Sequence, residues 1–178
     1  TKKYKIEDFK KIKKKKKILN YKVLGNEQYL KKLNKKSYNL HVSLGFIKSP
    51  SKRIKIFNEF RKLNFKFPII ISPRSYISKN AKILDGTIIH HNAVINFGVK
   101  IGFNSIINTS AIVEHGARIG NNCHISTRAV INGDVLVKDN TFIGSGSVIR
   151  EGVKIGDRSI ISAGKVVMRD LPNDTILR

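Results

Sequence analysis

Histidine is the residue type in this sequence best suited to proton transfer at neutral pH, because an imidazole titrates near that pH. The chain of 178 residues contains five: His41, His90, His91, His115 and His124. His41 alternates within a predicted strand, and His90 and His91 stand together at a predicted bend, so we interpret these three as structural or solvated. His115 and His124 are the candidates for chemistry because of the repeat that contains them.

Both candidates belong to a stretch with a period of six residues, which spans residues 71–172. A branched aliphatic residue occupies every sixth position, and a mostly small residue follows four positions later. Neither an α-helix nor a hairpin meander has this period, which is typical of a parallel β-helix of hexapeptide repeats. The aliphatic positions are Ile71, Ile77, Ile83, Ile89, Ile95, Ile101, Ile107, Val113, Ile119, Ile125, Ile131, Val137, Ile143, Ile149, Ile155, Ile161 and Val167.

Three hexads make one triangular coil of such a prism, so residues 18 apart stack on each other. This arithmetic places His115 above Phe97 and below Gly133, and the missing side chain of Gly133 leaves room for a small reacting group. His124 is nine positions further on, on another side of the prism, about 15 Å away at the rise of a strand. The two histidines can share a site only across an interface between parallel prisms, which predicts a cyclic oligomer, most naturally a trimer.

A second column consists of small residues. Ser145 and Ala163 are also 18 apart, and they could line a groove for a long, thin ligand. The single cysteine, Cys123, falls on an inward-facing repeat position, so we expect a packed thiol and not a nucleophile.

Basic residues are concentrated in the first third of the chain. Residues 1–66 hold 22 Lys and Arg against 4 Asp and Glu, a net charge of +18 out of +23 for the whole chain. No aromatic interleaving, zinc spacing or helix-turn-helix pattern accompanies the lysine run at 13–17, so we expect a solvated surface and no nucleic-acid site. A weaker reading is attraction of polyanionic ligands such as coenzyme A or a nucleotide sugar. No transmembrane stretch or signal peptide is evident, which predicts a cytoplasmic protein without a membrane span.

The residues before the repeat have the pattern of a small α/β unit. We expect strands at Tyr21–Gly25, Tyr38–Leu44 and Phe67–Ile71, and helical structure at 26–33. A second helix should begin at Ser49-Pro50, with Ser49 as the N-cap, and should continue to Leu63.

This first unit is incomplete as a nucleotide-binding domain. Residues 1–20 lack the glycine-rich turn that cradles phosphates at a helix N-terminus. We therefore expect a partial, Rossmann-like α/β unit over residues 1–70 and a parallel β-helix over residues 71–178. The repeat should end at Asp170-Leu171-Pro172, because proline cannot continue a strand ladder, and residues 173–178 should form a short tail.

The run from Ile107 to Gly120 (INTSAIVEHGARIG), with His124-Ile-Ser126, Asn132-Gly133 and residues 161–167, resembles the hexapeptide-repeat sugar acetyltransferases. The nearest branch includes UDP-4-amino-sugar N-acetyltransferases of bacillosamine synthesis, GDP-perosamine N-acetyltransferases and sialic acid O-acetyltransferases. In the first third, Glu7-Asp8-Phe9 and Leu44-Gly45 resemble strand ends of the family's nucleotide-sugar domain. The resemblance implies a left-handed β-helix, a homotrimer, and transfer of an acetyl group from acetyl-CoA to a nucleotide-linked deoxyamino sugar in bacterial glycan biosynthesis.

The resemblance also implies roles for individual residues. His115 matches the general base that takes a proton from the sugar amine as the amine attacks the thioester. His124 matches a residue that contacts acetyl-CoA near the thioester, and no metal is implied. The cofactor groove would be lined by Gly133, Ser145 and Ala163, and the expected contacts of the nucleotide-linked sugar are Glu7, Asp8, Gly45 and Asn108.

The sequence departs from the family at the residue after the candidate base. Many relatives have a carboxylate there, whereas this chain has Gly116. Glu114 precedes the histidine, but adjacent strand residues face opposite ways. The partner of His115 is therefore left open among Asn108, a backbone carbonyl or none. The family's Gly-x-Pro-Ala tail does not follow Arg178, so we expect a fragment or a remodelled member.

Other functions stay open beside N-acetylation. O-acetylation of a sugar or of sialic acid is one, because the carboxylate after His115 is missing. A zinc-dependent prism of the γ-carbonic anhydrase kind needs three converging histidines, and the spacing here does not match that family. A non-catalytic trimeric scaffold or polyanion-binding protein would use the lysine-rich first third.

Overall fold

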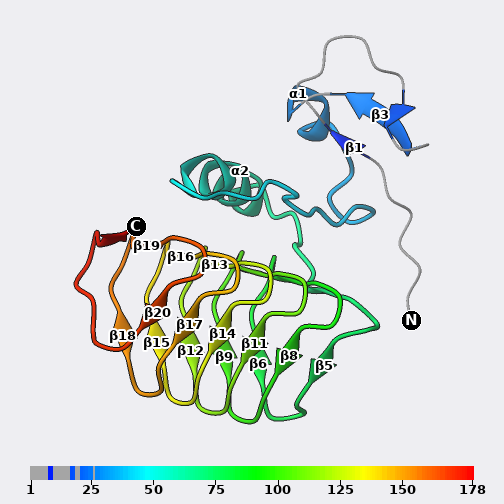
Figure 1. The fold of residues 1–178 in the computed structure, drawn as a ribbon. Coiled ribbons are helices and arrows are strands. Elements are labelled where there is room, and N and C mark those ends of the chain that lie inside the picture. The colour runs from blue at the N-terminus through cyan, green and yellow to red at the C-terminus, as the bar shows by residue number, and fades with distance from the viewer. Residues whose placement is uncertain (1–7, 10–16, 19–20, 26) are drawn as a thin grey trace.

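The computed structural model describes residues 8–9, 17–18, 21–25 and 27–178. Most of this chain forms a triangular prism of stacked coils, whose three sides are parallel sheets (Figure 1). The left-handed parallel β-helix of hexapeptide repeats that the sequence predicts is confirmed. We name the three sides by what lies on them.

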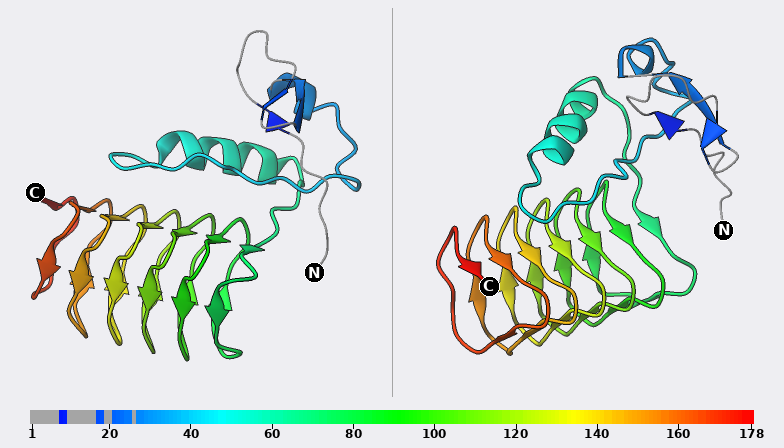
Figure 2. Two further views of the ribbon diagram at one scale, coloured as in Figure 1. Left: turned by 45° about the vertical axis from the view of Figure 1, so that its right-hand side comes forward. Right: turned by 45° about the horizontal axis from the view of Figure 1, so that its top comes forward.

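Of the described residues outside the prism, a helix and an extended segment lie over one face, the covered face (Figure 2). The covered face comprises β4 (Ile70–Ile71), β7 (Ile88–Ile89), β10 (Ile106–Ile107), β13 (His124–Ile125), β16 (Phe142–Ile143), β19 (Ile160–Ile161) and β21 (Ile176–Leu177). The striped face comprises β5 (Tyr76–Ile77), β8 (Val94–Ile95), β11 (Ile112–Val113), β14 (Val130–Ile131), β17 (Val148–Ile149) and β20 (Val166–Val167). The basic face comprises β6 (Lys82–Ile83), β9 (Lys100–Ile101), β12 (Arg118–Ile119), β15 (Leu136–Val137) and β18 (Lys154–Ile155).

The register of the sheets follows the period of the sequence. On the covered face Ile106 pairs with His124, and His124 pairs with Phe142, an offset of 18 residues each time. The last step is shorter: Ile160 pairs with Ile176, an offset of 16 residues. The expected end of the repeat at residues 170–172 is therefore wrong: the chain makes one further, shortened coil that closes with β21. Pro172 does not prevent this. The equivalent residue of the preceding coil, Gly156, donates its N–H to Leu171 O of the next coil, but Pro172 lies in the last coil described, so its missing N–H costs no ladder bond.

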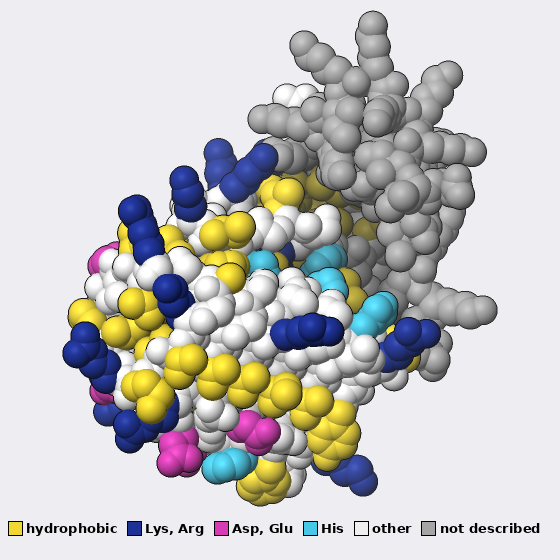
Figure 3. Space-filling view, viewed as in Figure 1, with side chains coloured by type: hydrophobic (Ala, Val, Ile, Leu, Met, Phe, Trp, Pro, Cys, Tyr) yellow, Lys and Arg dark blue, Asp and Glu magenta, His cyan; other side chains and the backbone are white. Residues whose placement is uncertain are grey.

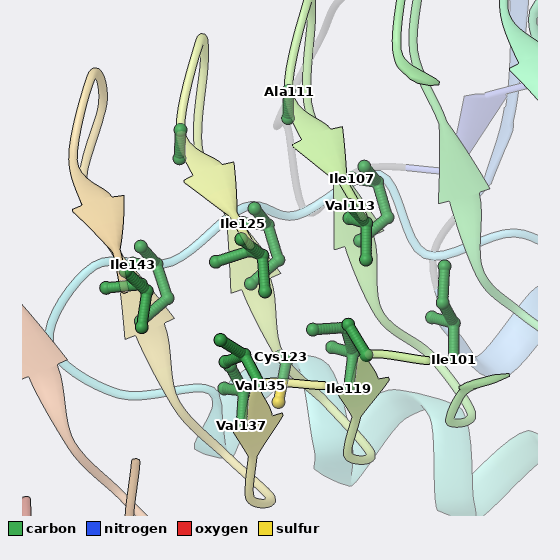
Figure 4. Close-up of a cluster of buried hydrophobic side chains, with 14 of the residues drawn as sticks. Ile101, Ile107, Ala111, Val113, Ile119, Cys123, Ile125, Val135, Val137 and Ile143 are labelled. Atoms are coloured by element: carbon green, nitrogen blue, oxygen red, sulfur yellow. The ribbon is translucent and has the colours of Figure 1, made fainter. Parts of the chain in front are cut away.

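The interior of the prism is a ladder of aliphatic side chains with small residues between them. Figure 4 shows Ile107, Ile125 and Ile143 in line along the axis, each one coil from the next, and places Cys123 beside Val135, Val137 and Ile119. β-Branched residues suit both the strand backbone and a narrow interior. Cys123 is fully buried, and burial raises the pKa of its thiol to about 12. The predicted packed thiol is confirmed.

The bends between strands require a left-handed backbone conformation at one position in nearly every hexad. Asparagine, aspartate and glycine supply it most often, as residue types that tolerate positive φ. Gly116 has φ 69° and Asp134, one coil later, has φ 57°. The residue after His115 is thus a bend residue, for which glycine is a natural choice.

The first unit contains strands and helices, as predicted, but with different bounds. β1 (Asp8–Phe9), β2 (Lys17–Ile18) and β3 (Tyr21–Gly25) form a sheet in the order β1-β3-β2, and the predicted strand at 21–25 is confirmed as β3. Helix α1 (Glu27–Leu30) is shorter than expected, and helix α2 (Ser51–Lys62) follows Pro50, which takes the N-cap position instead of Ser49. β4 begins the prism at Ile70, and a division of the chain into two domains at residue 70 stays a prediction.

The predicted strand Tyr38–Leu44 is wrong, apart from one isolated bridge between Asn39 and Lys66. The physical reason is Arg53, a buried residue of α2 that donates hydrogen bonds to backbone carbonyl groups of this segment. Its guanidinium donates to the carbonyl oxygens of Val42 and Leu44, and to that of Asn104 in the prism at 3.0 Å. These bonds replace a sheet ladder and fix the segment on the covered face.

Helix α2 lies along the prism, across successive coils (Figure 2). Its apolar side forms a second, smaller core with neighbouring segments, made of Leu30, Val42, Phe57, Phe60, Phe65 and Phe67. Within the described part of the chain, neither α1 nor α2 is long and apolar enough to cross a membrane.

Candidate active site

His115 stands exposed at the bend after β11, on the edge between the striped face and the basic face. Its ring rests on Gly133 of the next coil: a Cβ atom at Gly133 would come within 2.6 Å of Cε1 and 2.7 Å of Nε2. Backbone bonds fix the stack, from Gly116 N to Phe97 O and from Asp134 N to His115 O, both 2.9 Å. The predicted column of Phe97, His115 and Gly133 is confirmed.

The neighbours of His115 in sequence do not supply a partner for its ring. The carboxylate of Glu114 accepts a hydrogen bond from Asn96 Nδ2, in the preceding coil, at 2.7 Å. Gly116 has no side chain, and a Cβ atom there would overlap the carboxylate of Asp134. A carboxylate therefore lies beside the bend that carries His115, although it comes from the next coil.

Asn108, one of the residues considered as a partner of His115, lies beside His124 instead. Asn108 Nδ2 is 3.3 Å from His124 Nε2, and its Oδ1 accepts a hydrogen bond from the backbone N–H of Thr109 at 2.8 Å. Within one chain, Asn108 and His115 belong to different edges of the prism.

His124 lies on the covered face, where the chain at residues 45–46 packs over it. Its Nδ1 donates to the carbonyl oxygen of Phe46 at 2.8 Å, and its ring meets the rings of Phe46 and Phe142 edge to face. A Cβ atom at Gly45 would lie 3.8 Å from its Cε1 atom, which is ordinary contact distance. Burial lowers the pKa of His124, so the neutral form is favoured. The structure places His124 in a packed setting, and its contact with acetyl-CoA stays a prediction.

The two small residues expected in the cofactor groove stack as predicted. Gly164 N donates to Ser145 O at 2.9 Å, which puts Ser145 and Ala163 in successive coils of one edge, between the covered and striped faces. Both residues are exposed, and Ser145 Oγ is 2.8 Å from Ser126 Oγ. At these two positions the edge therefore carries only short side chains.

Three of the four residues expected to contact the sugar nucleotide belong to the described part of the chain. Glu7 lies outside the described residues, and Asp8 is the first residue of β1. Gly45 and Asn108 lie on either side of His124. The structure therefore brings two of the four residues together.

His90 lies near both His41 and His124, which the sequence pattern did not reveal, and His91 follows His90 in the chain. A positive charge on His90 would lower the pKa of both His41 and His124 by repulsion. His91 forms a hydrogen bond with Ser72 Oγ. Figure 3 shows several histidine side chains close together on the upper part of the prism. The 18-residue column of Ser72, His90, Asn108 and Ser126 is the signal that could have found part of this group. His41 could not be found that way, because it precedes the repeat.

Among the described residues, no group of three or more histidine, cysteine, aspartate or glutamate side chains is arranged to hold a metal ion.

The striped face presents a row of apolar side chains to solvent. Figure 3 shows this row crossing the front of the prism. Its inner members are half-buried, whereas Tyr76 and Val166 at the two ends are 58% and 63% exposed. The row consists of Tyr76, Val94, Ile112, Val130, Val148 and Val166. One edge of this face carries His115 and Gly133, and the opposite edge carries Ser145 and Ala163.

Comparisons with known proteins agree with the geometry. The family model described as bacterial transferase hexapeptide (six repeats) matches residues 98–133 and 134–169. PerB from Caulobacter crescentus, solved with CoA and GDP-perosamine, is 30% identical with a TM-score of 0.84, covering 90% of this chain and 77% of that one. A search of curated proteins found no match.

Two other solved structures are similar. The acetyltransferase domain of PglB from Neisseria gonorrhoeae is 25% identical with a TM-score of 0.88, covering 93% of this chain and 80% of that chain. WeeI from Acinetobacter baumannii shares the fold at 21% identity, with a TM-score of 0.80 and coverage of 90% and 76%. With its unbroken hexads, its stacked histidine and glycine, and these matches, the chain belongs to the hexapeptide-repeat family of sugar acetyltransferases.

Proposed function

We propose that this protein transfers the acetyl group of acetyl-CoA to the amine of a nucleotide-linked deoxyamino sugar. The observation that carries the proposal is the exposed ring of His115 against Gly133, at the edge of a prism similar to one solved with CoA and GDP-perosamine. That acyltransferases share this prism is a family property. The sugar acceptor and the role of His115 are the proposal.

In the proposed reaction the sugar amine attacks the thioester carbon directly. A C–N bond forms, the C–S bond breaks, and one proton of the amine passes to His115. The proton then leaves with the thiolate as free coenzyme A, so no covalent enzyme intermediate is needed. A positioned general base contributes about 100- to 10,000-fold to such a step.

The site is completed by a neighbouring protomer in this proposal. Three prisms that turn their striped faces toward a common axis bury the apolar row of each, and apolar burial is the main favourable term in association. In that arrangement the edge with His115 lies next to the neighbour's edge with Ser145 and Ala163. The two edges of one protomer face apart, which is why a closed ring suits them.

Acetyl-CoA would lie between these two edges. Its pantetheine arm is long and thin, and the column of Ser145 and Ala163 has no bulky side chain to block it. Gly133 leaves the space beside the ring of His115 where the thioester must come. In the same proposal, His124 lies near the thioester, and the sugar nucleotide contacts Glu7, Asp8 and Gly45 of the first unit and Asn108 of the prism.

The proposal is tested by following thiol release from acetyl-CoA. We would offer UDP-4-amino-4,6-dideoxy sugars and GDP-perosamine as acceptors, and compare the wild type with His115→Ala and with Lys82→Ala, an exposed control on the basic face. We expect amine-dependent release that falls at least about 100-fold in His115→Ala and is unchanged in Lys82→Ala. Mild base, which cleaves esters and spares amides, identifies the product. Full activity in His115→Ala would refute the general base, and a base-labile product would refute N-acetylation.

A further inference from the structure

His115 and Asp134 occupy opposite corners of a square of four bend residues from two coils. The lower coil contributes His115 and Gly116, and the upper coil contributes Gly133 and Asp134. The ring of His115 points up the prism and rests on Gly133, whereas the carboxylate of Asp134 points down and rests on Gly116. A backbone hydrogen bond of 2.9 Å from Asp134 N to His115 O ties the two residues together.

Each glycine of the square makes room for the side chain of the opposite coil. A Cβ atom at Gly133 would meet the ring of His115, and one at Gly116 would overlap Asp134 Oδ1. Asp134 Oδ1 therefore occupies the space that a side chain at position 116 would fill. The backbone allows a carboxylate to stand at either position 116 or position 134, because Gly116 and Asp134 both have positive φ, which aspartate tolerates better than most residues.

The carboxylate of Asp134 has no other role within the described residues. None of the hydrogen bonds or ion pairs found there uses its oxygens, and the side chain is exposed. Of the other acidic residues nearby, Glu114 accepts a hydrogen bond from Asn96, and Glu151 lies outside the square, one coil beyond Gly133. Asp134 is the carboxylate that shares the square with the imidazole.

From this square we propose that Asp134 is the positioning carboxylate of His115. It orients the imidazole and stabilises the positive charge that forms on the ring when the sugar amine gives up its proton. Asp134 itself stays ionised and takes no proton. The inference rests on the proposed function, since it assigns a partner to the general base of that reaction.

A negative charge in the same square as a forming imidazolium stabilises it by Coulomb attraction, even at an exposed edge. The substitution Asp134→Asn removes the charge and keeps the size, and asparagine is accepted at equivalent bends of this prism. We expect kcat to fall about 5- to 50-fold, with the KM for acetyl-CoA changed by less than about 2-fold. A merely structural role would instead change both constants together with the unfolding temperature.

The sharpest test moves the carboxylate from one coil to the other. In the double variant Gly116→Asp with Asp134→Gly, the charge returns to the same space from the lower coil, so we expect kcat within about 5-fold of the wild type. The matched neutral control, Gly116→Asn with Asp134→Gly, should stay as slow as Asp134→Asn. Equal rates for the two double variants would overturn the proposal.

A combined variant separates this inference from the proposed function. If Asp134 acts through His115, adding Asp134→Asn to His115→Ala causes no further loss, because there is no ring left to orient. A further loss of about 5-fold or more would assign Asp134 another role and overturn the inference. Wild-type turnover that depends on His115 but not on Asp134 would refute this inference alone. Turnover that does not depend on His115 would refute the proposed base, and the inference with it.

Discussion

His124 Nδ1 donates a hydrogen bond to the carbonyl oxygen of Phe46, 78 residues earlier in the chain. A carbonyl oxygen can only accept, so the proton is on Nδ1, and Nε2 of the neutral ring is left to accept from Asn108. This bond fixes the segment before α2 on the covered face, close to the group that also contains His41, His90 and His91.

The histidine group predicts a loss of stability in mild acid. Burial, with smaller contributions from Arg53 and His90, lowers the pKa of His41 from 6.5 to about 4, and burial also lowers the pKa of His90 and His124. The unfolded chain therefore takes up protons at a higher pH than the folded one. The contribution of His41 to stability is complete above pH 6.5 and is lost as the pH falls from 6.5 toward 4, and His90 and His124 act in the same direction.

Thermal unfolding between pH 7.5 and pH 5 measures this effect. We expect the midpoint to fall with pH in the wild type, and to fall less in His41→Gln, which cannot titrate. Identical pH dependence in both proteins would show that His41 is not a source of the effect.

Arg53 should be the most costly single side chain to remove from the seam between α2 and the prism. Arg53→Met fills the space but leaves the carbonyl oxygens of Val42, Leu44 and Asn104 without their donor. We expect a loss of about 2–4 kcal/mol in the free energy of unfolding, measured by urea denaturation. Arg61→Met is the control: Arg61 is exposed, lies over the ring of Phe103 at 4.4 Å, and should cost under about 1 kcal/mol. Equal losses in the two variants would contradict the assigned role of Arg53.

Two glycines of the prism should separate activity from stability. Gly133→Ala meets the movable ring of His115, so we expect turnover to fall by about 10-fold or more with little change in stability. Gly144→Ala instead meets the backbone at Ile161, Ser162 and Ala163, which cannot move aside, and should cost about 1–3 kcal/mol. Turnover assays and urea denaturation of both variants test this. Unchanged turnover in Gly133→Ala would show that the ring need not rest on residue 133.

The apolar row of the striped face predicts which substitutions prevent assembly. Val130 and Leu136 are matched, since each is the half-buried, outward residue of a two-residue strand, one hexad apart on different faces. Val130→Glu places a charge in the proposed interface, so we expect the mass measured by light scattering to fall from trimer to monomer, with loss of turnover. Leu136→Glu on the basic face should remain a trimer. A wild-type monomer, or a trimeric Val130→Glu, would refute this interface.

Much of the prism can be predicted from the sequence, because one constraint repeats in every hexad. The period sets which side chains point inward, and its third multiple sets which ones stack, as the column of His115 and Gly133 shows. Counting 18 residues on from Gly116 leads to Asp134. The same rule could therefore have found a carboxylate near His115, although the residue directly after His115 is a glycine. The covering segment could not be predicted in this way. Its conformation depends on Arg53 and His124, whose partners are far away in the sequence, and such contacts override local strand preference.

The 18-residue register also decides which changes of length the chain can tolerate. Removing or adding one whole coil beyond Asp134 slides the later columns along the axis and leaves every residue on its own face. An insertion of six residues between Asp134 and Ser145 would instead rotate everything after it by one side of the triangle, and Ser145 and Ala163 would leave their edge. Evolution and protein engineering can therefore lengthen this prism only in steps of a complete coil if the site beside His115 is to survive.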